Sequence, residues 1–299
     1  MKTILLSIIF LFVFGYVAIS QKPLTITESK IDLKHGSVPG FMLAIPEVSY
    51  ETINKSWIKS LQQGTKSDVQ MDMGELSIFG AIIREISETP INVYGYVKDM
   101  DSVTILAAAF ELKKDEYITS GTQSEKYAMA KEYLLKFAKD LYLDLAKDEL
   151  RDEEKKLNKL ESDLKSLEND KNKLEKMIQS NNTSIGSIND ELVILRTSLS
   201  SLNDELLIQT NQLNEMEESP AKEEKTNYVN DLEKRIKKTN KDVESGDKKI
   251  IDLRSEIEKA QVDEIPENLL EQQRIKVAIN QQKEVVRVST EKYDAIKAY

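Results

Sequence analysis

The 299-residue sequence has no cysteine and a single histidine, His35. Without cysteine the chain cannot form disulfide bonds, thiolate metal sites or a lipidated N-terminal cysteine. One histidine cannot make a multi-histidine metal site, and His35 stands before Gly36 in a polar stretch that is typical of a solvated loop. We therefore expect neither a metal nor a cofactor.

Sequence motifs of the common enzyme classes are also missing. The sequence has no Gly-x-Ser-x-Gly elbow, no phosphate-binding glycine loop and no dinucleotide fingerprint. The carboxylates of Asp99 and Asp101 are more typical of a turn than of an acid/base pair. We expect a protein that is not an enzyme, and the alternative is an unrecognised site in its N-terminal part.

Aromatic residues make up only 6% of the chain, and 42 basic residues face 52 acidic ones. Few aromatic and many charged residues favour long helices over a large compact core. An acidic surface is repelled by nucleic acid and by anionic lipid, so we expect neither as a partner.

The N-terminus has the pattern of a secretory signal peptide. The basic Lys2 precedes an apolar run from Ile4 to Ala18, and small residues close the segment at Ser20. This run is shorter than a membrane span, so residues 1–20 are predicted to be cleaved before Gln21, and an uncleaved signal anchor is the alternative. We expect an exported protein, periplasmic, cell-surface or secreted, with no membrane span after cleavage.

Residues 21–123 carry most of the glycine and proline and the only tryptophan, Trp57. Ser49 is the expected cap of a helix over Tyr50 to Gln63, in which Trp57 lies on the apolar face as a core anchor. Short β-branched runs between turn residues predict strands at 24–27, 31–33, 41–45, 68–73, 76–83, 91–98 and 102–112. The expected fold class is α+β, with a small antiparallel-sheet head domain followed by a long antiparallel α-helical coiled-coil hairpin.

The last expected strand of the head is apolar on both faces between Val103 and Phe110, so both faces should be covered. The following segment, residues 124–146, has a wide apolar helical face that suits packing on a sheet. We expect this helix to supply the cover.

From Leu150 to Met216 the sequence shows an unbroken 3-4 spacing of apolar residues. Such spacing keeps a narrow apolar seam on one side of a helix, and that seam must be buried against another helix. Sixteen of its twenty positions are Leu, Ile or Met. The series is Leu150, Leu157, Leu164, Lys171, Ile178, Ile185, Leu192, Leu199, Leu206 and Leu213 with Glu153, Leu160, Leu167, Leu174, Asn181, Ile188, Leu195, Leu202, Gln209 and Met216.

A second heptad series begins at Val229, after Pro220, which is expected to end the outgoing helix. We predict a coiled-coil hairpin over residues 147–299 with its tip at about 217–228. The predicted register places Leu213 opposite Leu232. It also aligns the poor helix formers of 179–186 with 260–267, which contain Pro266, and so predicts a joint across both arms.

Four aliphatic residues, Val193, Ile194, Leu207 and Ile208, lie off the seam at positions where a solitary hairpin would show polar residues to water. They predict a protein partner or self-association as a homo-oligomer through the stalk. The alternative is that they are scattered surface aliphatics.

The order of signal peptide, Phe41–Pro46 strand, Trp57 helix, Ile91–Val97 strand and stalk resembles uncharacterised exported proteins of Bacteroidetes that join a small α+β head to a coiled coil. The resemblance implies an envelope location and no catalytic residues. Asp101-Ser102-Val103 also resembles the O-glycosylation motif of that group, which makes Ser102 a candidate glycosylation site.

The sequence therefore favours a non-enzymatic exported structural or interaction protein, in which the head anchors or binds a partner and the stalk spaces or oligomerises. The first alternative is a periplasmic holdase chaperone with coiled-coil arms, resembling the Skp-type design. A second is an efflux-type adaptor, but such proteins resume β-structure after the helical hairpin and this chain ends in a helical pattern.

Overall fold

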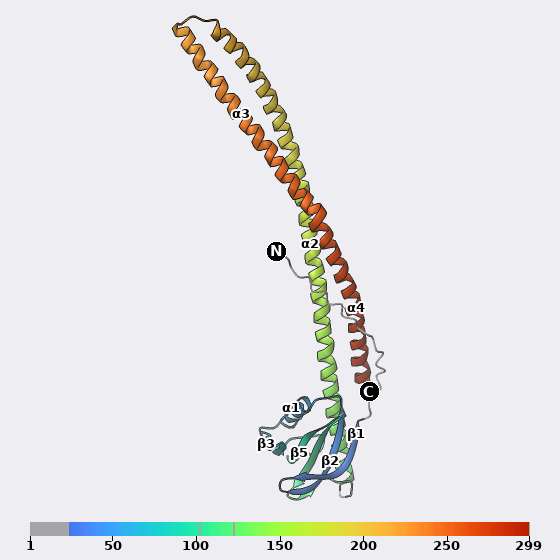
Figure 1. Cartoon of the computed structure of the whole chain (residues 1–299). Coiled ribbons are helices and arrows are strands. Elements are labelled where there is room, and N and C mark those ends of the chain that lie inside the picture. The colour runs from blue at the N-terminus through green and yellow to red at the C-terminus, as the bar shows by residue number, and fades with distance from the viewer. Residues whose placement is uncertain (1–23, 102, 122, 299) are drawn as a thin grey trace. The chain divides into compact units, whose positions relative to one another are not determined.

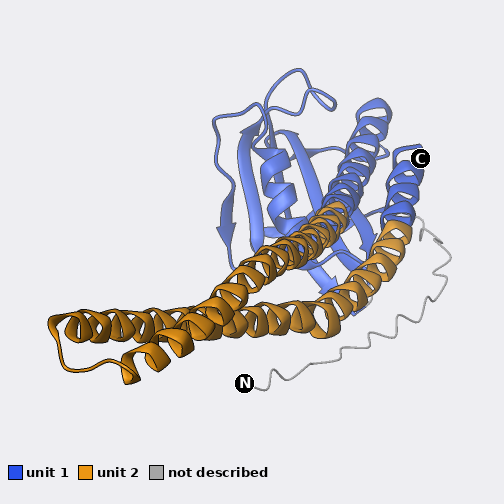
Figure 2. Cartoon of the chain, turned by 90° about the horizontal axis from the view of Figure 1, so that it is seen from above, with its two compact units in different colours: residues 1–153, 286–299 blue, residues 154–285 orange. Residues whose placement is uncertain are grey.

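The computed structural model describes residues 24–101, 103–121 and 123–298. The predicted signal peptide and Ser102 lie outside the described residues. The chain forms two compact units, residues 1–153 with 286–299 and residues 154–285 (Figure 2). The expected fold class is confirmed, since an antiparallel sheet with a helix is followed by long helices.

The head is a seven-stranded antiparallel sheet (Figure 1). Its strand order is β1-β2-β6-β5-β4-β3, and the short β7 pairs with the end of β6. The strands are β1 (Thr25–Leu33), β2 (Gly36–Pro46), β3 (Gln70–Asp72), β4 (Glu75–Ala81), β5 (Ile91–Met100), β6 (Val103–Lys113) and β7 (Glu116–Tyr117).

One face of the sheet packs on two helices, α1 (Tyr50–Leu61) and the first turns of α2 (Ser124–Asn214). The Ser49 side chain caps α1 by accepting a hydrogen bond from the Thr52 N–H, as the sequence predicts. Trp57 is 1% exposed and lies 5.0 Å from the Phe137 ring of α2 in an edge-on contact. The core-anchor role of Trp57 is therefore confirmed.

The opposite face is covered differently from the expectation. The β1–β2 hairpin supplies its cover, with Ile31 packed against Ala107 and Ala109 of β6. At the hairpin turn the Lys34 backbone N–H donates to the Glu75 carboxylate of β4 at 3.0 Å. The helix covers one face only, because the hairpin is long enough to reach across the small alanine side chains of the other.

The apolar seam is confirmed along its whole length. All twenty positions, nineteen on α2 and Met216 just after its end, are buried or partly buried. In the second unit the seam contains an apolar cluster of the buried residues Ile188, Leu192 and Ile250. The partner is the returning helix, as the 3-4 spacing requires.

The returning arm consists of α3 (Pro220–Lys259), η1 (Ala260–Glu264) and α4 (Ile265–Ala298). The predicted tip at 217–228 is too long, since α2 ends at Asn214 and α3 begins at Pro220. Pro220 starts a helix because its missing N–H is one that the first turn leaves unused, and Ser219 caps that turn.

The shorter tip moves the register by one heptad. The predicted register places Leu192 opposite Leu253, whereas Leu192 lies against Gly246. A Cβ atom on Gly246 would lie 2.8 Å from Leu192 Cδ2, so the missing side chain allows a close approach of the arms. A shift of seven residues keeps apolar positions facing one another, which is why the heptads alone cannot reveal it.

The predicted joint is correct for one arm only. Residues 260–264 form a π-helix just before Pro266, whereas 179–186 continue as regular α-helix. The buried and partly buried positions of the return arm run in 3-4 spacing to Ala260 and continue with the adjacent pair Glu264 and Ile265, so the next apolar residue of the seam is Ile265, five residues on. The π-turn absorbs this extra residue and so keeps the seam facing α2.

Two glycines provide a first test of this packing. Gly186→Ala should raise the free energy of unfolding of the stalk by about 1 kcal/mol, because alanine favours helix and nothing lies within 4 Å of the added Cβ. Gly246→Ala should raise the free energy of unfolding clearly less, because its added Cβ meets the Leu192 side chain. Urea unfolding followed by circular dichroism measures both, and an equal gain would contradict the close approach.

The π-turn provides a second test. Deleting the exposed Val262 together with Pro266→Ala should keep or raise the melting temperature, because 3-4 spacing is restored and no proline remains in the helix. Deleting the exposed Lys238 is the control and should lower it, because the seam on either side falls out of phase. Equal losses in the two deletions would show that the π-turn does not serve the seam.

Candidate functional site

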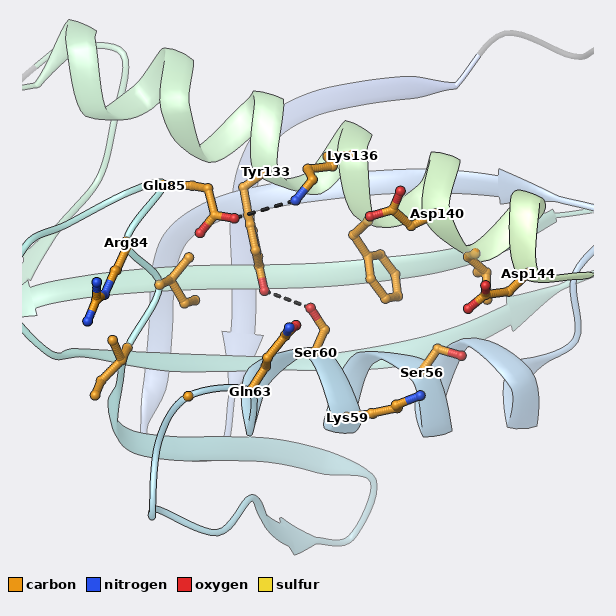
Figure 3. A pocket seen from close by; sticks show the side chains of 15 residues that line it. Ser56, Lys59, Ser60, Gln63, Arg84, Glu85, Tyr133, Lys136, Asp140 and Asp144 are labelled. Carbon is orange, nitrogen blue, oxygen red and sulfur yellow. Dashed lines mark hydrogen bonds and ion pairs between the residues drawn. The ribbon is translucent and has the colours of Figure 1, made fainter. Parts of the chain in front are cut away.

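The helix face of the head carries an open cleft of about 1070 Å³ between α1, α2 and the segment after β4, here called the helix-side cleft. Figure 3 shows Tyr133 reaching from α2 toward Ser60 on α1, and the two hydroxyl groups are hydrogen-bonded at 2.8 Å. Burial raises the pKa of the Tyr133 phenol. This contact ties the two helices together.

The charges of the helix-side cleft are balanced. Lys59, Arg84 and Lys136 line it together with Glu85, Asp140 and Asp144. Lys136 Nζ also lies 3.5 Å from a Glu85 carboxylate oxygen, so these two charges offset one another (Figure 3). The cleft therefore has no preference of sign for a ligand.

The opposite face carries a second hollow of about 1090 Å³ beneath the β1–β2 hairpin, here called the hairpin cavity. Its lining comes from the hairpin, from β4, β5 and β6, and from the chain after β6. Its lining includes Leu33, Val38, Pro39, Glu75, Phe79, Asn92, Tyr94, Glu111, Lys114, Asp115, Glu116, Tyr117 and Gln123.

A buried carboxylate, Glu111, lies in the hairpin cavity and is only 6% exposed. One oxygen accepts hydrogen bonds from Asn92 Nδ2 at 2.8 Å and from the Tyr94 hydroxyl at 2.9 Å. The other accepts from the Asp115 backbone N–H at 2.9 Å. Burial opposes the charge, but these hydrogen bonds outweigh burial and lower the pKa of the Glu111 carboxyl, so it is ionised at neutral pH.

Aromatic rings stand beside this carboxylate. Tyr94 contacts Phe79 at 5.9 Å between ring centres and Tyr117 at 6.5 Å. Burial and the hydrogen bond to Glu111 raise the pKa of Tyr94 to about 12. Phe79 is half exposed, so its ring borders both the cavity and solvent.

The structure places the four predicted interaction residues together on the outer side of α2. Val193, Ile194, Leu207 and Ile208 are 62%, 69%, 62% and 53% exposed. We call this set the α2 stripe. It lies opposite the buried seam on the same helix, because positions "b" and "c" of a heptad point away from "a" and "d".

The other sequence candidates have simpler positions. Asp101, with φ of 38°, forms the turn between β5 and β6 as predicted, whereas Asp99 lies in β5 opposite Thr104. His35 is exposed in the β1–β2 turn, as the sequence predicts, and is one of the residues that line the hairpin cavity. Ser102, the candidate glycosylation site, lies outside the described residues.

Glu111 is the functional candidate that reading the sequence missed. The sequence shows an acidic residue at the end of an apolar strand, on the same face as Ala107 and Ala109. That period-2 pattern could have marked it as inward-facing. Asn92 and Tyr94, its partners on β5, become visible only once the strand pairing is known.

The tyrosines of the head predict a pH dependence. Burial first raises the pKa of both Tyr94 and Tyr142 to about 12, against an ordinary value near 10. The neutral phenols therefore stabilise the head below about pH 10, and this contribution is lost as the pH rises toward 12. Absorbance at 295 nm should show that some tyrosines ionise only near pH 12. The number of these tyrosines should fall by one in Tyr94→Phe and by one in Tyr142→Phe. A wild-type titration complete by pH 11 would contradict the assignment.

Among the described residues no helix is long and apolar enough to cross a membrane. Within the same residues no group of three or more His, Cys, Asp or Glu side chains is arranged to hold a metal ion. No model of a known protein family matches the chain, and no curated protein matches it.

Proposed function

We propose that this protein is an exported, non-enzymatic interaction protein whose stalk self-associates through the α2 stripe while its head binds a partner. The observation that carries the proposal is the α2 stripe itself, four large aliphatic side chains more than half exposed on one helix face. Large aliphatic side chains that gather on one exposed helix face favour an interaction site.

The α2 stripe fits a second copy of the same helix. Its two aliphatic pairs are two heptads apart, about 20 Å along the helix, with Ser200 and Ser201 midway between them. An antiparallel pair of copies related by a two-fold axis between these serines would place Val193 and Ile194 of one copy against Leu207 and Ile208 of the other. Small serines at the centre allow the helices to approach closely.

The charges on this face agree with the same pairing. Asp204 would meet Thr197 of the second copy, and Asp190 would meet Asn211. All four of these side chains are exposed in the single chain. The two-fold pairing therefore places no acidic side chain opposite another, which an acidic protein needs in order to self-associate.

Sedimentation of Ile194→Asp and Leu207→Asp variants tests this proposal. The wild-type protein should sediment as a dimer, and each variant as a monomer with unchanged circular dichroism, because a carboxylate would be buried in the dimer interface. Ile251→Asp is the matched control, since Ile251 is 66% exposed on the return arm, and it should remain dimeric. A monomeric wild type, or a dimer that survives Leu207→Asp, would contradict the proposal.

A further inference from the structure

We propose that the hairpin cavity binds an organic cation, a protonated amine or guanidinium group at the end of a carbon chain. This deepens the part of the proposed function that concerns the head. It does not depend on self-association through the α2 stripe, which lies in the other unit.

Charge is the first argument. Among the described residues, four carboxylates line the hairpin cavity, those of Glu75, Glu111, Asp115 and Glu116, and Lys114 is the one lysine or arginine in that lining. Glu111 is the most informative of them, because it is buried and its hydrogen bonds hold it in the ionised form. A fixed negative charge on a buried side chain attracts a cation more strongly than one on an exposed side chain does.

The aromatic rings are the second argument. Phe79, Tyr94 and Tyr117 border the cavity in tilted and edge-on contacts, which leaves ring faces available to a ligand. A cation is attracted to the electron-rich face of such rings. The Tyr94 hydroxyl donates to the Glu111 carboxylate, so the ring is electron-rich and its orientation is fixed.

The hairpin cavity also contains a buried hydrogen-bond acceptor on Gln123. The Gln123 side chain lines the cavity, and its Nε2 donates to Glu116 at 2.7 Å. Its Oε1 is buried and has no hydrogen-bond partner among the described residues. Buried acceptors are rarely left unpaired, and an ammonium or guanidinium N–H is the donor that this site would take.

The remaining wall explains the preference for a carbon chain. Leu33, Val38 and Pro39 of the β1–β2 hairpin line the cavity with apolar surface. An alkyl stem can lie along such a surface while its charged end reaches the carboxylates, as lysine and arginine stems do elsewhere. A bare metal ion would gain nothing from this apolar wall.

The helix-side cleft provides an internal comparison. It has a similar volume, but its charges are balanced and its Tyr133 hydroxyl is hydrogen-bonded to Ser60. The two hollows of the head therefore differ in chemistry more than in size, and a cation should bind more tightly in the hairpin cavity.

Calorimetric titration of the full chain tests the proposal with three probes. Nα-acetyl-lysine amide stands for a side chain of a partner protein, and cadaverine stands for a free amine. Both should bind, and the tighter of the two identifies the source of the ligand. The third probe, Nα,Nε-diacetyl-lysine amide, has the same stem without the charge and should not bind. Absence of binding by both amines, or equal binding of the acetylated probe, would overturn the proposal.

Three variants locate the site. Phe79→Ala should weaken amine binding about 3- to 10-fold without unfolding the head, because the ring is half exposed. Glu111→Gln should abolish binding, and Phe79→Ala keeps the test valid if Glu111→Gln does not fold. Glu85→Gln in the helix-side cleft is the control and should bind as the wild type does. Unchanged binding in Phe79→Ala, or loss in Glu85→Gln, would place the amine elsewhere and overturn the proposal. A monomeric protein that still binds the amines would contradict only the self-association.

Discussion

The buried seam between α2 and the returning helix is the constraint on which the stalk depends. A helix as long as α2 cannot bury an apolar face against itself, so its 3-4 seam requires a partner helix from the same chain or from another. The chain meets this requirement with a short tip, a glycine that admits Leu192, and a π-turn that absorbs one extra residue. All three local features serve the alignment of a single apolar line.

The same seam determines which side of α2 remains free. Once positions "a" and "d" are buried, the α2 stripe is left on the opposite side with no cover from the described residues of its own chain. Ser200 and Ser201 divide the stripe into two equivalent halves. The proposed self-association would use this outer face, because a helix already packed on one side has its opposite side available to a second copy.

The head follows a different constraint, the small side chains at the middle of β6. Ala107 and Ala109 let the β1–β2 hairpin close over the sheet, and Gly40 is required there because a Cβ would lie 2.8 Å from the Ala108 backbone carbonyl oxygen. Beneath the hairpin Glu111 is buried and Tyr94 and Tyr117 are partly buried, whereas Phe79 is half exposed. A polar group is retained at that depth only because Asn92, Tyr94 and the Asp115 N–H satisfy it.

The periodicity of the sequence predicts the elements that depend on it, and the seam, the α1 helix and most strands lie where expected. The prediction that Pro220 ends the outgoing helix is wrong, because a proline starts a helix as readily as it ends one. The heptad register and the bend of the β1–β2 hairpin depend on tip length and on contacts distant in sequence, so neither is visible locally.

Because the chain has no cysteine, an introduced thiol pair tests the hairpin most directly. Leu192→Cys with Gly246→Cys should form a disulfide within one chain on oxidation, and Leu192→Cys with Leu253→Cys should not. A bond in the second pair, or cross-links only between chains, would contradict the hairpin and its register.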